Sequence, residues 1–531
     1  MKTMKFFLSM AALALVGAMT VSCSSDDNII DQPQQQEVTK NNVVTLTTTV
    51  GLGGDDATRA LTSTGVKTFA VGETMALRYK NKKGDWVKAV SNALEPGDIA
   101  AGSKSATFTF TLDNPDKTQN VDYIYPAAIV NPAGNMNEAA LFGSQDGTLN
   151  TIASTFDYSR KIGAWEGENL PSLTLENQLA ILAITLKNAD GSSNITSTIT
   201  GLTISDGTKT YNVTPSAAEG PIYVAIFPTE DATITVTATD GTKNYIKTLT
   251  GKTYAKGNGY PVSWKMAKVV DYSSEINVPA GDHWYISGVG EHNITIGEGA
   301  TVTIGGYLHM QNASIICSGN ATIILADGTD VNIFNGRIKA GPEGSTLTIK
   351  GNTGELNINP GIVMGAAIGA SDVACGNIVI EGGVITATGV QGAGIGASNA
   401  ACGNITISGG TVTATASDTG GAGIGSGSSS GAWCGNITIS GGTVTATGGF
   451  KSAGIGTGEE NGCGDITIKS TVTSVTATKG SYAEASIGAA IDGDAICGTV
   501  TIDGVANATT SSTFTNFNSS VSGNTWTLTH K

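Results

Sequence analysis

Residues 402–415 read CGNITISGGTVTAT, and residues 434–447 repeat the same fourteen letters. Related versions follow the other cysteines of this region, as CGNIVIEGGVITAT at 375, CGDITIKSTVTSVTAT at 463 and CGTVTIDG at 497. A second element precedes each copy, as AAIG at 366–369, AGIG at 393–396, 422–425 and 453–456, and ASIG at 485–488. Most of the length variation lies in the Gly/Ser/Ala-rich connections, so turns absorb it and the motif itself forms the structural unit.

Apolar and polar residues alternate within the motif. Ile405 and Ile407 alternate with polar neighbours such as Asn404, so one set points inward and the other faces solvent. One unit cannot bury its inward face alone, whereas stacked units bury it against each other. The repeat therefore predicts a right-handed parallel β-helix over 361–531 with a C-terminal cap, in which like residues stack about 4.8 Å apart. Less regular alternation predicts entry coils over 269–360.

Stacking of the motif predicts two ladders of identical side chains. The first is an asparagine ladder whose amides bond from coil to coil, formed by Asn377, Asn404 and Asn436. The second is a cysteine ladder, formed by Cys375, Cys402, Cys434, Cys463 and Cys497. We expect small, buried free thiols, with a disulfide framework as the alternative because an exported protein meets an oxidising compartment. No cysteine pair has CxxC spacing, so we expect no structural zinc.

Composition limits the classes of function. The 531 residues have room for two to four domains, and 71 glycines with only 6% aromatic and 14% charged residues suit closely stacked strands. The net charge of −15 repels phosphate backbones, so we expect no nucleic-acid partner.

The N-terminus has the features of an export signal. Lys2 and Lys5 precede the apolar run FFLSMAALALVGAM, which ends in TVSC. TVSC resembles a bacterial lipobox with Cys23 as the lipid-bearing residue, and SSDD follows it. This resemblance implies a signal peptide at 1–22, a flexible tether at 23–41 and an outer-membrane lipoprotein that touches the membrane only through its lipid. An ordinary secretory signal is the alternative.

The next part of the chain has longer strands and no repeat. SATFTFTLD at 105–113 alternates strictly, and LAILAITL at 179–186 is typical of a buried central strand. Turn signals recur at the spacing of antiparallel sandwiches. We therefore predict an all-β protein with one β-sandwich at 42–165 and a second at 166–268.

Several segments of this region resemble the fimbrillin-like family of Gram-negative fimbrial subunits. They are a threonine-rich first strand, ATRAL at 57–61, GETMALRYKN, YIYP at 123–126 and LTGKTYAKGNGYPVSW. The resemblance implies a lipoprotein precursor with two sandwiches that acts in assembly or adhesion at the cell surface or in a fimbrium. Simple shaft subunits lack a β-helix, which favours a tip-like component or a stand-alone adhesin. The repeats themselves resemble those of bacterial surface proteins, some of which bind carbohydrate.

The same family resemblance implies a processing site. In VVTLTTTV at 43–50, Val44, Leu46, Thr48 and Val50 share one strand face. Proteolysis between Arg59 and Ala60 would remove this strand, and the strand of another fimbrial subunit would take its place by donor-strand exchange. The alternative is a permanently anchored protein in which Arg59 lies in a surface loop.

Candidate sites for chemistry are sparse. The acidic residues do not recur at one position of the repeat, so we predict no enzyme and no cofactor; a polysaccharide lyase or hydrolase is a distant third function. The loops contain four acidic residues that are candidates for weak Ca²⁺ binding: Glu459, Glu460, Asp492 and Asp494. The alternative is that they are ordinary solvated acids of surface turns. Three aromatic residues are candidates for stacking on a host or surface glycan, or for covering the corners of the coil: Trp433, Phe450 and Tyr482. We expect adhesion as the function, with non-catalytic carbohydrate capture as the alternative.

Overall fold

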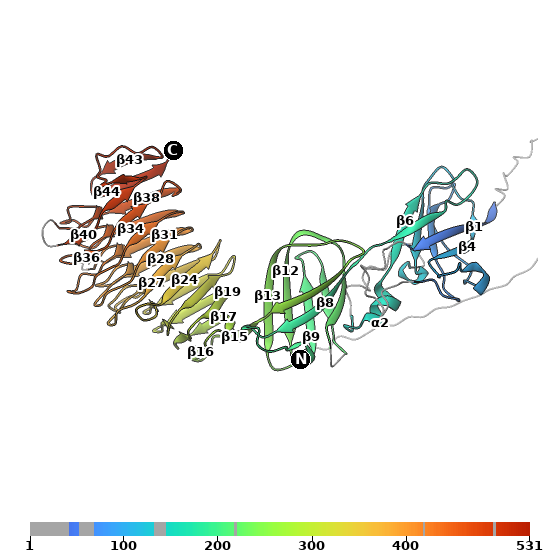
Figure 1. Cartoon of the computed structure of the whole chain (residues 1–531), viewed down its shortest axis with the longest axis horizontal. Coiled ribbons are helices and arrows are strands. Elements are labelled where there is room, and N and C mark those ends of the chain that lie inside the picture. Colours follow the sequence, from blue (N-terminus) through green and yellow to red (C-terminus); the bar gives the residue numbers. More distant parts are fainter. Residues whose placement is uncertain (1–41, 53–67, 132–144, 217–219, 418–419, 492–494) are drawn as a thin grey trace, which may run out of the picture.

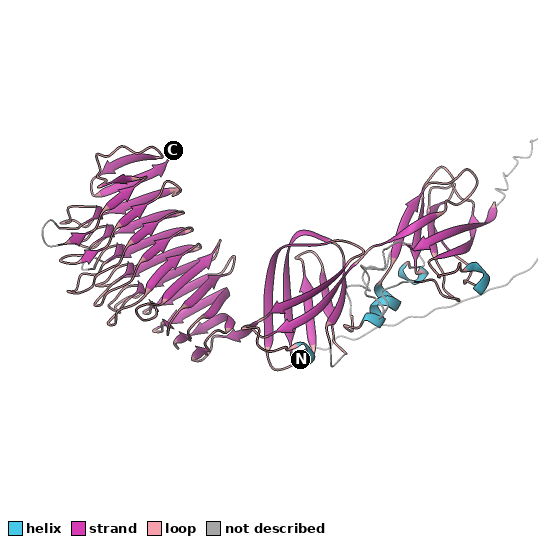
Figure 2. Cartoon of the chain, viewed as in Figure 1, coloured by secondary structure: helices cyan, strands magenta, loops and turns pink. Residues whose placement is uncertain are grey.

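The computed structural model describes residues 42–52, 68–131, 145–216, 220–417, 420–491 and 495–531. Almost all of these residues lie in strands or in the turns between them (Figure 2). The chain forms three bodies in a row, with the N-terminal strand at one end and the repeat region at the other (Figure 1). Cys23, Arg59 and Ala60 lie outside the described residues, so lipidation and cleavage stay predictions.

The first body is a seven-stranded sheet in the order β3-β2-β5-β6-β7-β1-β4. Its strands are β1 (Val43–Leu52), β2 (Ala76–Lys80), β3 (Trp86–Val90), β4 (Ser105–Asp113), β5 (Val121–Tyr125), β6 (Ser159–Gly163) and β7 (Leu173–Asn177). The sheet curls until its two edges approach, where the Asn92 N–H donates to the Thr109 carbonyl at 2.9 Å. The enclosed core includes the fully buried rings of Phe108, Phe110 and Tyr123.

Strand β1 lies inside this sheet and not at its edge. It pairs antiparallel with β4 from Val43 to Gly51, and its last residues pair parallel with β7. The face that points inward is the one expected from the alternation of the sequence. Thr48 and Val50 on that face are buried, whereas the threonines between the residues of that face are exposed. The N-terminal strand thus completes the first core.

The second body is a two-sheet sandwich. Its strands are β8 (Ala180–Lys187), β9 (Gly201–Ser205), β10 (Thr210–Val213), β11 (Ile222–Ile226), β12 (Thr229–Thr239), β13 (Asn244–Tyr254) and β14 (Gly259–Lys265). The antiparallel strands β10-β9-β12-β13 form one sheet, and β11-β8-β14 form the other. Leu182, Ile204 and Val236 are buried between the two sheets.

The division between these two bodies differs from the expected limit at 165. Strand β7 still belongs to the first sheet, because it pairs with β6 and β1. Conversely, the segment after residue 144 packs into the second core through Ile152 and Phe156. The side-chain amide of Gln145 bonds both backbone groups of Ala225 at 2.8 Å. The two bodies are interlocked, which no local sequence pattern indicates.

Among the residues of this half that the structure describes, helical structure is limited to single turns. These are η1 (Pro96–Asp98), η2 (Ala127–Ile129), α2 (Leu149–Thr151), the π-turn η3 (Ile152–Phe156) and η4 (Thr196–Thr198).

Strand β15 (Ala267–Asp271) joins the second body to the repeat region. It pairs antiparallel with β13 and parallel with β17 (His283–Gly290), the first long strand of the coil. One hydrogen-bonded sheet therefore continues from the sandwich into the solenoid.

The repeat region is a solenoid of stacked coils with three main strand faces, as the repeat predicts (Figure 1). The first face contains β17, the start of β19 (Ala300–Gln311), β21 (Ala321–Leu325), β24 (Thr346–Gly351), β27 (Asn377–Ile380), β30 (Ile405–Ile407), β33 (Ile437–Ile439), β37 (Ile466–Ile468) and β41 (Val500–Ile502). The second contains the end of β19, β22 (Asp330–Phe334), β25 (Glu355–Asn359), β28 (Val384–Gly389), β31 (Thr411–Ala416), β34 (Thr443–Thr447) and β38 (Ser474–Thr478).

The third face consists of very short strands. They are β16 (Ile276–Val278), β18 (Ile294–Ile296), β20 (Ile315–Cys317), β23 (Ile338–Lys339), β26 (Ile368–Gly369), β29 (Ile395–Gly396), β32 (Ile424–Gly425), β35 (Ile455–Gly456) and β39 (Ile487–Gly488). All pair parallel with the coil below. In-register stacking explains the repeated Ile-Gly pair. The glycine has φ near +135°, and a Cβ on Gly425 would collide with the carbonyl of Gly456.

The last coil is capped. Strands β36 (Gly462–Cys463) and β40 (Ile496–Cys497) pair at the cysteine corner, and β42 (Val505–Ala506) folds back on β41. The hairpin of β43 (Phe517–Ser522) and β44 (Thr525–His530) closes the second face, because β44 pairs antiparallel with β38. Trp526 and Leu528 of this hairpin are buried over the end of the core.

Candidate functional site

The asparagine ladder exists, but its hydrogen bonds differ from those expected. The side-chain oxygen of Asn377 accepts the backbone N–H of Asn404 at 2.9 Å, and Asn404 accepts that of Asn436 at 2.8 Å. The predicted amide-to-amide bonds are therefore replaced by side-chain-to-backbone bonds. The reason is that the chain turns at this corner and leaves the next coil's N–H without a strand partner. Asp465 continues the ladder, since its carboxylate accepts the Thr499 N–H at 2.7 Å.

The cysteine ladder is a stack of free thiols in the structure. Cys375, Cys402, Cys434 and Cys463 bridge one another in parallel register, and Cys463 pairs with Cys497. The Sγ atoms of Cys463 and Cys497 are 3.3 Å apart. Cys463 donates this hydrogen bond and so lowers the pKa of the Cys497 thiol. Cys317 lies apart in β20, where burial raises the pKa of its thiol to about 12.

The three candidate aromatic residues do not form one platform. Phe450 and Tyr482 occupy the same connection in successive coils, with ring centroids 4.5 Å apart. Trp433 lies at the cysteine corner, in the connection between β32 and β33, where its ring covers Gly462. All three remain substantially exposed, at 47%, 67% and 45% for Phe450, Tyr482 and Trp433. The chain thus offers an exposed aromatic pair and a separate tryptophan.

The proposed Ca²⁺ loops show ordinary surface contacts where they are described. Glu459 forms an ion pair with Lys451, while Asp492 and Asp494 fall outside the described residues. Within the described part of the chain, no three His, Cys, Asp or Glu residues gather in a way that could hold a metal ion. No helix in the same part is long and apolar enough to cross a membrane.

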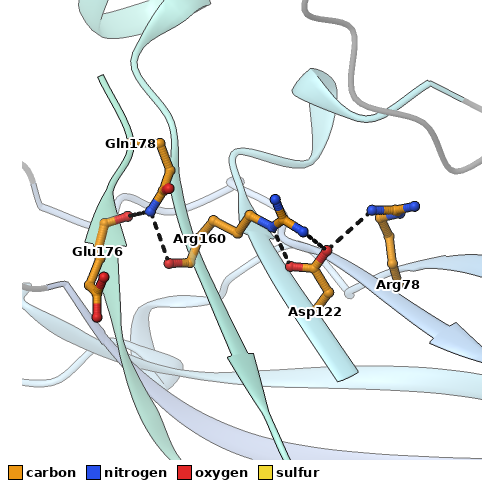
Figure 3. A network of polar contacts seen from close by, with 5 residues as sticks. All are labelled: Arg78, Asp122, Arg160, Glu176 and Gln178. Atoms are coloured by element: carbon orange, nitrogen blue, oxygen red, sulfur yellow. Dashed lines mark hydrogen bonds and ion pairs between the residues drawn. The ribbon is translucent and has the colours of Figure 1, made fainter. Parts of the chain in front are cut away.

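A cluster of charges that the sequence analysis missed lies on the outer face of the first sheet. Asp122 on β5 is held between two arginines from neighbouring strands (Figure 3). Arg160 contacts both carboxylate oxygens, through Nε at 2.7 Å and Nη2 at 2.8 Å. Arg78 makes one longer contact through Nη1 at 3.2 Å. The Asp122 side chain is only 4% exposed, so the carboxylate at the centre of this triad is nearly buried, whereas the Arg160 side chain is 34% exposed.

Trp86 borders this triad on the neighbouring strand β3. The Arg78 guanidinium carbon lies 5.2 Å, and the Lys80 ammonium 5.6 Å, from the centre of its ring, within cation–π range. Trp86 is nevertheless 51% exposed. These residues line a depression of about 330 Å³, which we call the basic pocket: Arg78, Lys80, Trp86, Gln119, Asn120, Asp122, Arg160 and Ile162.

Three of the eight lining residues could have been predicted from the sequence to lie together. In RYKNKKGDWVK, at 78–88, a turn separates two alternating segments, which places Arg78, Lys80 and Trp86 on one face of a hairpin. Asp122 and Arg160 come from distant segments, and no spacing rule connects them to that hairpin.

A second ionic cluster connects the first two bodies. Glu176 on β7 accepts hydrogen bonds from Lys161 and, at 2.9 Å, from Lys256 in the turn after β13. The bond from Lys161, followed by that from Lys256, lowers the pKa of Glu176 to about 2. Gln178 continues the network, donating to the backbone carbonyls of Glu176 and Arg160 at 2.7 and 3.3 Å (Figure 3).

Comparisons with known proteins agree with the solenoid. Residues 378–399, 405–428 and 437–459 match the Beta helix repeat family. Two solved structures are similar to parts of the chain. One is a Bacteroides fragilis protein to which a role in cell adhesion has been ascribed, with 12% identity and a TM-score of 0.26, covering 41% of this chain and 92% of that one. The other is a fimbrial assembly protein of Parabacteroides distasonis, with 11% identity and a TM-score of 0.25, covering 42% and 90%. No curated protein matches the sequence.

Proposed function

We propose that this protein is a cell-surface adhesin that displays its β-helix at the end of a two-domain stalk. The observation that carries the proposal is the unbroken sheet through β15, which joins the second sandwich to the solenoid without a flexible linker. The interlocked sandwiches continue the stalk to β1 at the opposite end (Figure 1). Such a molecule holds a large surface away from its N-terminal attachment point.

Attachment through a lipid on Cys23 to the outer membrane completes this proposal. The polar tether at 23–41 would separate the lipid from β1. A Cys23→Ser variant should be exported but lost from the membrane fraction, whereas a secretory protein without lipid would behave the same with either residue.

Strand exchange with another subunit is the second mode of attachment that we propose. Removing β1 after cleavage at Arg59 would open a groove between β4 and β7 and expose the core residues that Val50 and Leu52 of β1 cover. A strand from another subunit could fill this groove with the same alternation. We propose no catalytic step and no cofactor in either mode.

Carbohydrate capture by the solenoid is the second candidate function. It is favoured by the exposed pair of Phe450 and Tyr482, whose position is fixed by the bond from the Tyr482 N–H to the Phe450 carbonyl at 3.0 Å. Aromatic rings that are exposed and rigid are suited to stacking on sugar rings.

The direct test of adhesion is retention of cells on a glycan-coated or host-cell surface under flow. Cells that display the full chain should be retained more strongly than cells that lack it, and soluble full-length protein should compete. Equal retention with and without the chain would refute the proposal. If a Phe450→Ala, Tyr482→Ala double variant abolishes retention on glycans while display is unchanged, the solenoid pair carries the contact.

A further inference from the structure

We propose that the basic pocket of the first sheet binds a carboxylated sugar, such as a uronic or sialic acid unit of a glycan. This site is separate from the solenoid, and its ligand class does not depend on the adhesion proposal. Three features of the pocket favour such a ligand: its positive charge, the exposed ring of Trp86 and the neighbouring amides.

The pocket is positive in a strongly negative protein. The chain carries a net charge of −15, yet three of the eight residues that line the pocket are cationic and only Asp122 is acidic. Arg160 already engages both oxygens of Asp122, so a single carboxylate serves two guanidinium groups. The excess positive charge favours an anionic ligand.

Arg78 is the cation best placed to bind such a ligand. Its one contact to Asp122, at 3.2 Å, is the longest of the triad, and its buried Nε–H has no hydrogen-bond partner among the described residues. Buried donors are normally paired in folded proteins. The buried Nε–H itself cannot reach a ligand, so a ligand in the pocket would meet Arg78 through its Nη groups. Guanidinium groups bind carboxylates in planar, two-point geometry, which makes a carboxylate the natural additional partner.

Trp86 distinguishes a sugar from a simple anion. Its ring is held by Arg78 and Lys80, yet it stays half exposed beside the cations. An inorganic phosphate would satisfy the cations and leave this apolar surface bare. A sugar that carries a carboxylate presents both an anion and an apolar ring face, and the amides of Gln119 and Asn120 at the rim can bond its hydroxyls.

The experiment is a binding titration of the purified full chain with three glycans that end in galacturonate, glucuronate or sialic acid. Each is compared with its carboxyl-reduced, neutral counterpart. We expect at least one acidic glycan to bind about tenfold more tightly than its neutral form, and added salt to weaken that binding. Trp86→Ala and Arg78→Gln should each lower the affinity about tenfold. Both variants should fold, because Trp86 is exposed and Arg160 still pairs with Asp122.

Matched controls come from the solenoid. Tyr307 is 53% exposed, so Tyr307→Ala removes an equally exposed ring, and Lys350→Gln removes a surface cation paired with Glu381. Both control variants should bind as the parent does. The proposal is overturned if no acidic glycan is preferred over its reduced form, or if the controls lose as much affinity as Trp86→Ala. Because binding is measured on purified protein, its failure is distinct from a failure of cell adhesion.

Discussion

The ammonium group of Lys268 lies 4.0 Å from the centre of the Trp284 ring. The two residues are also backbone partners, Lys268 on β15 and Trp284 on β17, at the point where the sandwich meets the solenoid. The indole N–H of Trp284 donates to Asp282 at 2.7 Å, which fixes the ring beneath the lysine. Side-chain and backbone contacts thus reinforce the same junction, which supports the display of the solenoid as part of one rigid molecule.

The Ile-Gly strand of each coil makes a strong prediction about glycine. Gly425→Ala should destabilise the solenoid by several kcal/mol, because its φ of +137° disfavours a side chain and the added Cβ meets the Gly456 carbonyl. Gly431→Ala is the control, with φ of +84° but open space around it. Thermal unfolding should show a much larger loss for Gly425→Ala. Equal losses would mean that backbone strain alone, and not close stacking, selects the glycine.

The side-chain-to-backbone ladder predicts which residues can replace asparagine. Asn404→Leu removes the acceptor for the Asn436 N–H and should destabilise the protein by about 0.5–1.5 kcal/mol, because the lost bond is exposed to water. Asn404→Asp keeps an acceptor, as Asp465 does naturally, and should lose much less. Chemical denaturation measures both. If Asp is as harmful as Leu, the ladder depends on amide donors instead.

The thiol ladder predicts a distinctive labelling pattern. A chain expressed from residue 24 onward retains six of the seven cysteines, and all six should react with a thiol reagent after denaturation. In the native protein, Cys497 should react first, because it is only partly buried and its pKa is lowered by the bond from Cys463. Peptide mapping identifies the labelled site. Absence of free thiols in the denatured chain would instead establish disulfides.

The Glu176 cluster predicts a pH dependence of stability. The pKa of Glu176 is lowered in the folded state, so its contribution is fully present above the unfolded value of about 4.3 and is lost as pH falls towards about 2. The melting temperature of the parent should therefore exceed that of Glu176→Gln near neutral pH, and the difference should shrink in acid. A difference that is independent of pH would exclude this ion cluster as its cause.

The solenoid could be predicted from the sequence because the same contacts recur in every coil. CGNITISGGTVTAT specifies strand, corner and stacking neighbour at once, and even Asp465 fits the asparagine position. Apolar and polar alternation likewise predicts that Val50 lies on the buried face of the first strand, as the structure shows. Local sequence patterns are sufficient to predict contacts wherever a residue packs against the equivalent residue of the next repeat or lies in a strand with regular alternation.

The basic pocket and the connections between the domains could not be predicted from the sequence, because they depend on pairings between distant segments. Asp122 meets Arg160 only because β5 and β6 are adjacent, although the segment that packs on the second sandwich separates them in sequence. Gln145 reaches Ala225 of β11 in the same way, although 80 residues separate the two in sequence. The separation of Trp433 from Phe450 and Tyr482 likewise follows from which corner each loop occupies, and spacing alone does not reveal it.

Rigid display of the solenoid requires β15 to act as a rigid joint, and amide hydrogen exchange of the full chain measures this directly. The backbone of Ala267–Asp271 pairs with β13 on one side and β17 on the other, so its amides should be protected to the same degree as those of the two neighbouring strands. The exposed turn at Ser430 and Gly431 supplies the fast-exchanging reference within the same molecule. Protection of β15 at the level of β13 and β17 is the predicted result. Exchange of β15 as fast as the turn would show a hinge between sandwich and solenoid and would contradict the rigid display proposed for this protein.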